Sequence, residues 1–401
     1  MEKSPRLLPD DVLADVLARL APRALAVSRA VCREWRLRAD LLPISLGGIF
    51  IRTNEPETPA FFVRPSMAHR IAGDLDYYLE TDPCQRYCYT PDIVDCCNGL
   101  VLLEDHVVNP ATRQWVCLPP YPALPEHKGT QGSRGQYYRF LAFDPTSSPH
   151  YEMLAMKGPP YCKDKLPEGL AWPPSVSMLL IYSSSTGRWE KRPFVRKGPA
   201  ITLINNLWPA SDLGDTDAVY WHGALYVYWS EFSMRIALSD DTYQVISLPS
   251  SINTSEYYHP HLGKSKIGVH FVVVDDQHRL QVWFLDETGG KTEWVLKHGA
   301  NLQALKLPTD TDRPWILQDG NYDQGSNREP VLEKELDWES DDDDNAVDVE
   351  ERDKKHPFSW IEVLGFHPYR EIIFLLFCSS RVVAYYFNSS KVQDLRIKHN
   401  Y

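Results

Sequence analysis

The sequence predicts an α+β protein with several domains, in which a small three-helix unit (residues 1–45) precedes an all-β domain (residues 46–401). Three observations predict this division. Apolar residues recur at helical spacing in about the first 42 residues. After residue 42, short runs rich in Val, Ile, Tyr, Phe and Trp alternate with clusters of Gly, Pro, Asn, Asp and Ser. One hairpin-like pattern also recurs along the β region, which is typical of a fold built from repeated units.

The first predicted helix begins at Pro9 and Asp10. Proline is tolerated in a first turn, where no amide donor is needed, and an acidic group is stabilised by the positive end of the helix dipole. Pro22 ends this helix, and a second set of apolar residues follows. Three short helices bury little apolar surface against one another. Part of that surface must therefore pack against the rest of the chain or against another protein.

Two motifs dominate this segment, Leu8-Pro9-Asp10-Asp11-Val12-Leu13 and Val31-Cys32-Arg33-Glu34-Trp35. With them, the segment up to about Leu42 resembles an F-box, the module that docks onto a Skp-type adaptor in cullin–RING ubiquitin ligases. The chain departs from the pattern at Ala21, where proline is expected, and at Ser28, where a large apolar residue is usual. The alternative is an ordinary amphipathic helical start that packs on its own domain. The resemblance implies that the adaptor-binding residues are Leu8, Pro9, Val12, Leu13, Val16, Leu17, Leu20, Leu25, Val31, Cys32 and Trp35.

The β region contains no long helical stripe, so a parallel βαβ architecture is not expected. Its predicted strands are short apolar runs that are bounded by turn-forming residues. The clearest runs are Phe61–Val63, Leu100–Leu103, Phe140–Phe143, Met178–Tyr182, Leu225–Trp229, Val269–Val274, Gln281–Leu285, Ile372–Phe377 and Val382–Phe387.

The recurring pattern reads as strand, polar turn and strand. Its clearer copies are residues 107–115, 181–189 and 237–245, and weaker copies are residues 283–294 and 385–395. Equivalent positions in the first four copies are 74, 56 and 49 residues apart, and the two shorter spacings suit a propeller blade of about 40 to 50 residues. The sequence therefore predicts a β-propeller-like domain.

Trp115 and Trp189 occupy matching positions in two of these hairpins, each three residues after a threonine. Because the repeat demands the same role from both, we expect each indole to be largely buried between adjacent blades. Arg113 and Arg188 are expected to lie in the turns.

Several further motifs accompany the hairpins: Cys97-Asn98-Gly99-Leu100-Val101, Asn109-Pro110-Ala111-Thr112-Arg113-Gln114-Trp115, Leu118-Pro119, Phe143-Asp144-Pro145, Trp221-His222-Gly223-Ala224-Leu225-Tyr226 and Gln281-Val282-Trp283. With these, most of residues 90–400 resembles the F-box-associated domain of plant F-box proteins, which is related to kelch-like propellers. The resemblance implies a domain that presents a target protein to a ligase.

Charge is concentrated in one place. Residues 333–355 contain twelve acidic and four basic residues, a net charge of −8 within a chain whose net charge is −12. This composition predicts a disordered acidic insert, in which Ser340 and the four aspartates after it resemble an acidophilic kinase site. The acidic balance argues against a nucleic-acid partner.

No apolar run reaches the roughly 20 residues that span a bilayer, and the N-terminus lacks a signal-peptide pattern. We therefore expect no membrane partner and a cytoplasmic or nuclear location, with the eight cysteines as free thiols. Cys84, Cys88, Cys96 and Cys97 invite a zinc hypothesis, but their spacing matches no recognised knuckle. No metal and no cofactor are predicted.

Candidate chemistry is sparse. His259 and His261 are interpreted as solvated loop residues, and the pairs Asp240-Asp241 and Asp275-Asp276 as hairpin turns. A ligand-stacking platform could be formed by Trp221, Tyr226, Tyr228 and Trp229, about half of which should face the core instead.

Three functional hypotheses follow. The favoured one is a non-catalytic substrate-recognition subunit of an SCF-type (Skp–cullin–F-box) E3 ubiquitin ligase that binds a target protein of unknown identity. The alternatives are a ligase-independent scaffold and a glycan-binding or glycan-processing propeller. Perturbed carboxylates around a central channel would favour an enzyme.

Overall fold

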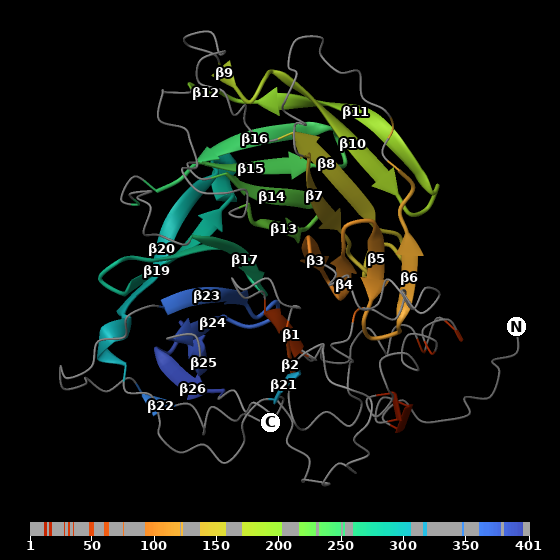
Figure 1. Ribbon diagram of the computed structural model, residues 1–401. Coiled ribbons are helices and arrows are strands. Elements are labelled where there is room, and N and C mark those ends of the chain that lie inside the picture. The colour runs from red at the N-terminus through yellow and green to blue at the C-terminus, as the bar shows by residue number, and fades with distance from the viewer. Residues whose placement is uncertain are drawn as a thin grey trace, which may run out of the picture.

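The computed structural model describes the β domain and parts of the N-terminal segment. The described ranges are residues 93–120, 137–157, 171–202, 216–229, 232–249, 260–305, 361–377 and 381–395, with residues 48–51, 60–63, 316–318 and 347–348 and the single residues 12, 13, 16, 17, 28, 31, 32, 35, 75, 122, 252. Within them the chain is mostly β, as the alternating sequence pattern predicts (Figure 1). No described helix is long and apolar enough to cross a membrane.

Most strands belong to antiparallel meanders of neighbouring hairpins. One four-stranded sheet consists of β3 (Asp95–Cys97), β4 (Leu100–Leu102), β5 (His106–Asn109) and β6 (Gln114–Cys117). A second consists of β17 (His261–Ser265), β18 (Gly268–Val274), β19 (Arg279–Asp286) and β20 (Glu293–Asn301). A five-stranded sheet consists of β22 (Val347–Asp348), β23 (Ile361–Phe366), β24 (Ile372–Phe377), β25 (Arg381–Tyr386) and β26 (Lys391–Asp394).

The largest sheet joins two such meanders. Its order is β13-β14-β15-β16-β11-β10-β8-β7. The first meander consists of β7 (Tyr137–Ala142), β8 (Glu152–Lys157), β10 (Val176–Ser183) and β11 (Arg188–Lys197), and the second of β13 (Ala218–Trp221), β14 (Ala224–Trp229), β15 (Phe232–Ala237) and β16 (Thr242–Ser247). Short sheets pair β1 (Gly48–Ile51), β2 (Ala60–Val63) and β21 (Ile316–Gln318), and β9 (Ala171–Trp172) with β12 (Ile201–Thr202).

The eight-stranded sheet is nearly closed into a barrel. β11 and β16 are its parallel pair, in register from Val195↔Thr242 to Lys197↔Gln244, and the two end strands β7 and β13 also contact each other. Arg192 strengthens the junction by donating to the carbonyl of Leu238 and by pairing with Asp241. The rolled sheet encloses an apolar core to which both meanders contribute, including Leu154, Phe194 and Trp229.

Neighbouring sheets cover the outer face of this barrel. The β17–β20 sheet packs on β14 through Tyr226, Tyr228 and Phe271, so all six residues of β14 are buried. About half of Trp221, Tyr226, Tyr228 and Trp229 were expected to face the core, but three of the four, Tyr226, Tyr228 and Trp229, are buried, so that expectation is wrong. Alternation still holds along β14, but each of its faces meets a different core.

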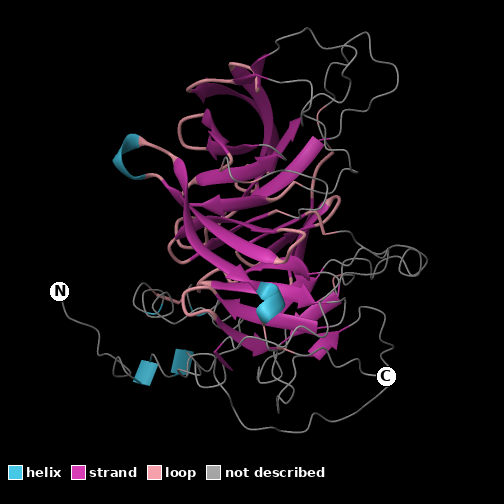
Figure 2. Cartoon of the chain, turned by 90° about the vertical axis from the view of Figure 1, so that its left-hand side faces the viewer, coloured by secondary structure: helices cyan, strands magenta, loops and turns pink. Residues whose placement is uncertain are grey.

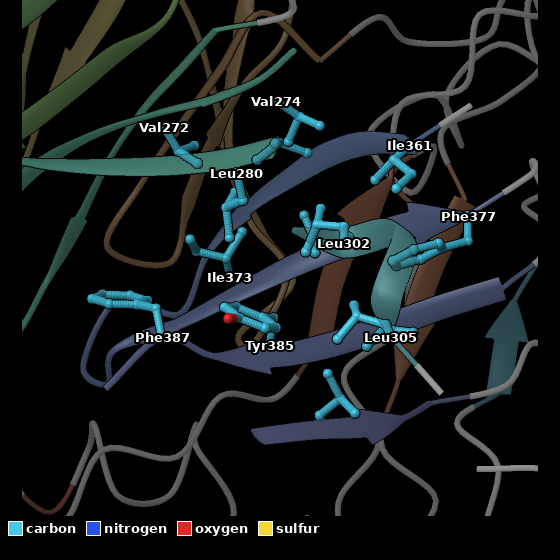
Figure 3. Close-up of a cluster of buried hydrophobic side chains, with 14 of the residues drawn as sticks. Val272, Val274, Leu280, Leu302, Leu305, Ile361, Ile373, Phe377, Tyr385 and Phe387 are labelled. Atoms are coloured by element: carbon cyan, nitrogen blue, oxygen red, sulfur yellow. The ribbon is translucent and has the colours of Figure 1, made fainter. Parts of the chain in front are cut away.

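The β17–β20 and β22–β26 sheets share a further core (Figure 3). Val272 and Leu280 on one side meet Ile373 and Tyr385 on the other. Leu302, in the short 3-10 turn η4 (Leu302–Ala304), closes this core and is fully buried. These repeated apolar sheets agree with the predicted β-propeller-like architecture.

All five predicted hairpins are confirmed. They are β5–β6, β10–β11, β15–β16, β19–β20 and β25–β26. In four of them the residue just before the second strand has a positive φ, namely Arg113, Gly187, Asp241 and Ser390. A left-handed residue at this point turns a tight loop back into the twisted sheet. The equivalent of Arg113 is thus Gly187, and Arg188 begins β11 instead of lying in the turn as expected.

The two tryptophans do not share one environment, so the predicted equivalence is wrong for Trp115. All four residues of β6 are exposed, and Trp115 is 42% exposed with its ring edge against His106. Trp189 is partly buried beside Tyr182, and its indole N–H donates to the carbonyl of Pro119 at 2.8 Å. The two indoles differ in burial because of where their strands lie. Trp115 is on β6, the edge strand of its sheet, whereas Trp189 faces the β3–β6 sheet.

Two other expectations differ from the structure. Within the acidic segment, Val347–Asp348 form β22 and pair with Lys391 and Val392 of β26, so these two residues are strand and not loop. The remainder of residues 333–355 lies outside the described residues. His261 begins β17, where it pairs with Asp217, and is not a solvated loop residue. The aspartate pairs at 240–241 and 275–276 do lie at hairpin turns.

The tryptophan environments lead to unequal mutational costs. We expect Trp189→Ala to lower the free energy of unfolding by about 2–3 kcal/mol, because it removes packing and a hydrogen bond, and Trp115→Ala to cost about 1 kcal/mol or less. Trp189→Phe should recover most of the packing. Urea unfolding of the three variants measures this, and equal losses for the two alanine variants would contradict the assignment.

Acid sensitivity should come from two buried histidines. Burial lowers the pKa of His270, which packs against Phe284, Phe366 and Phe387, to about 4, and burial lowers the pKa of His367 likewise to about 4. A histidine held neutral stabilises the fold fully above its unfolded pKa of about 6.5, and this contribution is lost as the pH falls towards 4. We expect each of these two histidines to lower the free energy of unfolding by about 2 kcal/mol at pH 5 relative to pH 7. His270→Gln, compared with wild type in urea unfolding at both pH values, should remove about half of that loss.

Candidate functional site

The N-terminal segment presents its apolar residues in two directions. Residues 12, 13, 16 and 17 have helical backbone. Leu13 and Leu17 are buried, whereas Val12 and Val16, one turn apart on the neighbouring stripe, are each 41% exposed. The predicted stripe is thus divided, with two leucines packed inward and two valines left at the surface.

The second F-box-like motif is also exposed. Val31 is 59% exposed, Cys32 is exposed, and Trp35 is partly buried. Ser28, the departure from the usual large apolar residue, is buried, and its carbonyl accepts a hydrogen bond from the Val31 amide at 3.1 Å. Helical backbone is described at residues 12, 13, 16, 17, 28 and 35, so the three-helix arrangement itself remains a prediction. Leu8, Pro9, Leu20 and Leu25 lie outside the described residues.

A second candidate site consists of polar residues and lies where the first strands of several sheets meet. We call it the polar centre, and its members are Asp95, Asp217, His261 and Lys264. Asp95 in β3 accepts hydrogen bonds from the amides of Cys96 and Leu141, at 2.7 and 2.6 Å. Burial raises the pKa of Asp95 to about 7, and the nearby Asp217 carboxylate acts in the same direction. Asp217 in turn accepts from the Leu262 amide at 3.2 Å.

Lys264 in β17 is the cation of this polar centre. Its ammonium group donates to Asn98 Oδ1 at 3.0 Å and to the carbonyl of Tyr220 at 2.9 Å, and Asn98 donates onward to the carbonyl of Phe143 at 2.6 Å. Burial lowers the pKa of Lys264, while the carboxylates of Asp144 and Asp95 oppose that shift. The bonds of one side chain thus tie β13 and β17 to the turn after β3.

His261 completes the polar centre. Burial disfavours its charged form, but the Asp217 carboxylate 2.9 Å away outweighs burial and raises the pKa of His261. Its ring stacks on Phe366 of β23, so it connects that strand to the centre. The sequence did not single out Lys264, Asp95 or Asp217. A charged residue within a short strand or directly before one is the signal that could have found them.

The chemistry of the polar centre is structural. The carboxylate oxygens of Asp95 accept backbone amides, and Asp217 is held by His261 and by an amide, so both groups join strands to one another. Among the described residues, no group of three or more His, Cys, Asp and Glu is arranged to hold a metal. Cys97 donates to the carbonyl of Phe143, and Cys84 and Cys88 lie outside the described residues.

Comparison with known proteins decides the nature of the N-terminal segment. Residues 6–44 match the family model described as the F-box domain. The chain carries an F-box domain. It is similar to the F-box protein At5g07610 of Arabidopsis thaliana, with 22% identity over 74% of this chain and 71% of the relative. It is also similar to the putative F-box/kelch-repeat protein At1g15680 of Arabidopsis thaliana, with 24% identity over 74% of this chain and 73% of the relative.

Solved structures give weaker likenesses. YCF48 bound to D1 peptide matches with 8% identity and a TM-score of 0.33, covering 76% of this chain and 67% of that one. The WD40 domain of SCAP from fission yeast matches with 12% identity and a TM-score of 0.20, covering 75% and 74%. The propeller-like character therefore rests on the four- and five-stranded antiparallel sheets themselves. F-box proteins are in general non-catalytic adaptors, and the F-box implies binding of a Skp-type adaptor in SCF complexes.

The polar centre should control how stability depends on pH. The folded protein favours the neutral form of Asp95. The contribution of Asp95 to the free energy of unfolding therefore falls as the pH rises from about 4 to the folded pKa near 7, and it is constant above pH 7. Lys264→Met removes a nearby cation, and the pKa of Asp95 should then rise further. We expect the urea midpoint of Lys264→Met to keep falling between pH 7 and 8.5. The free energy of unfolding should fall by about 1.4 kcal/mol for each unit by which the pKa of Asp95 rises further. The exposed Lys191→Met is the control, and identical pH profiles for the two variants would contradict this role.

Proposed function

We propose that this protein is the substrate-recognition subunit of an SCF-type E3 ubiquitin ligase, in which the F-box binds the Skp-type adaptor and the β domain binds a target protein. The observation that carries the proposal is the F-box match at residues 6–44 together with apolar F-box side chains left at the surface. Exposed aliphatic groups on a short helix are typical of a protein interface.

The mechanism that follows is proximity without bond chemistry in this chain. The F-box holds the protein to the ligase core, and the β domain raises the effective concentration of the target near the ubiquitin-carrying enzyme. Such a subunit would act in the cytosol or the nucleus, where the ligase core and its targets meet. The glycan alternative loses support because Tyr226, Tyr228 and Trp229, the aromatic residues of the suggested platform, are buried.

The exposed and buried residues of the F-box should respond differently to mutation. We expect Val12→Glu/Val16→Glu to abolish co-purification of the Skp-type adaptor while leaving the melting temperature within about 2 °C, because these side chains are exposed and a few anchors dominate binding energy. Leu17→Ala should instead destabilise the segment, since Leu17 is fully buried.

Ile267→Glu is the matched control, because Ile267 is an exposed aliphatic residue in the turn between β17 and β18. It should leave adaptor binding unchanged. Undiminished adaptor binding by the double valine variant would overturn the interface, and the ligase-independent scaffold would then be the better description.

A further inference from the structure

The β10–β11 ribbon has one outer face that only partly meets another sheet. Its inner face, with Leu179, Ile181 and Phe194, belongs to the barrel core. On the outer face, Tyr182 and Trp189 pack under the β3–β6 sheet near the hairpin turn. Farther from the hairpin turn, towards Val176 and Val195, the β3–β6 sheet no longer covers this face.

Four apolar residues lie together beyond that point, and we call them the ribbon patch: Val176, Met178, Pro193 and Val195. They form two directly opposed cross-strand pairs, Val176↔Val195 and Met178↔Pro193, and therefore share one face. Val176, Met178 and Val195 are 47%, 45% and 51% exposed, and Pro193 is exposed too. Opposed pairs of aliphatic side chains at the surface make a contiguous patch, unlike single exposed residues, which are normal.

The charge around the ribbon patch is positive, although the chain is acidic. β11 reads RWEKRPFVRK, with five basic residues and one acidic residue, within a chain of net charge −12. Lys191 and Lys197 alternate with Pro193 and Val195, so they flank the patch on the same face. Lys197 reaches Asp240 at 2.7 Å but is still 61% exposed. Arg192 and Arg196 belong to the opposite face, where Arg192 holds Asp241 and Arg196 donates to the carbonyl of Pro173.

The position of the ribbon suits a second binding surface. In Figure 1 the β10–β11 ribbon and β9–β12 lie at the top of the molecule, and the short N-terminal helical pieces lie at the lower right. Figure 2, turned about the vertical axis, also shows those helical pieces at the lower end. A partner on the ribbon patch would therefore not compete with one on the F-box.

We propose that the ribbon patch is a docking surface for an acidic segment of a partner protein that carries aliphatic side chains. The aliphatic groups would cover the two cross-strand pairs, and the carboxylates would meet Lys191 and Lys197. An apolar centre with a charged rim is the usual anatomy of a protein interface, and the lysines select the sign of the partner's charge. This inference rests on the proposed function only in regarding the partner as a ligase target.

The test begins with selection of peptides on the full chain. A displayed library of random 12-residue peptides is selected on wild type and counter-selected on Met178→Glu/Val195→Glu. We expect the wild-type-selective peptides to be acidic and aliphatic. The absence of a wild-type-selective pool, or a pool of basic peptides, overturns the proposal.

Binding of the most enriched peptide is then measured by fluorescence anisotropy. Met178→Glu/Val195→Glu should weaken it at least about tenfold, as expected for loss of an interface anchor. Lys191→Glu should weaken it too, and a peptide with Lys in place of Glu should recover affinity for that variant. The affinity should fall as salt is raised. The matched control is Val295→Glu/Leu296→Glu on β20, where the side chains are 37% and 49% exposed. Equal weakening by the control overturns the proposal.

Two other occupants have distinct outcomes. If a second copy of the chain covers the ribbon patch, sedimentation will show a dimer that Val195→Glu dissociates. If the chain's own acidic segment covers it, peptides will bind only after deletion of residues 333–355. Either result overturns an external partner. Adaptor co-purification from the same preparations is scored separately, so loss of the F-box function and loss of the ribbon surface are distinguished.

Discussion

The central strands of the sheets are buried on both faces, and this burial governs how the sheets are arranged. β14, β18 and β24 are buried at every position, so each belongs to two cores at once. A single sheet cannot bury two apolar faces, and every such sheet therefore requires a neighbour on each side. The chain meets this requirement with successive antiparallel meanders packed face to face, and the barrel-like joining of two of them surrounds one core almost completely. Removal of one sheet would expose the faces of two others.

This constraint also decides where binding can take place. Aromatic residues that are dense in sequence, such as those of β14, are used to fill the space between sheets and are not available to a ligand. The charged residues of the polar centre likewise hold the sheets together. Asp95, Asp217 and Lys264 form hydrogen bonds with backbone amides and carbonyls of neighbouring strands. A buried polar group must find such partners to be tolerated. We therefore propose that partners bind at the periphery, at the F-box at one end of the molecule and at the ribbon patch at the other.

The hairpins show how a repeat can be structurally regular and weak in sequence. Four of them place a left-handed residue directly before the second strand, yet that residue is Arg113, Gly187, Asp241 or Ser390. The backbone requirement is shared, and only glycine meets it without steric cost. For Arg113, Asp241 and Ser390 the positive φ carries a modest conformational free-energy cost, and the pairing of the surrounding strands outweighs it. The geometry of the turn is thus repeated while the residue that adopts it varies.

Spacing and turn formation are local properties of the chain, so the F-box, nine of the strands and all five hairpins could be predicted from the sequence. It could not decide which side chains are buried. Trp115 and Trp189 match in the repeat, but one lies on an outer strand and the other faces a neighbouring sheet. Val16 and Leu17 are adjacent in one apolar stripe, yet only the leucine packs inward. The polar centre and the ribbon patch were not predicted either, since their members come from distant strands or depend on where a covering sheet ends. Whether a side chain is buried depends on which surfaces pack together, and that packing joins segments far apart in the sequence.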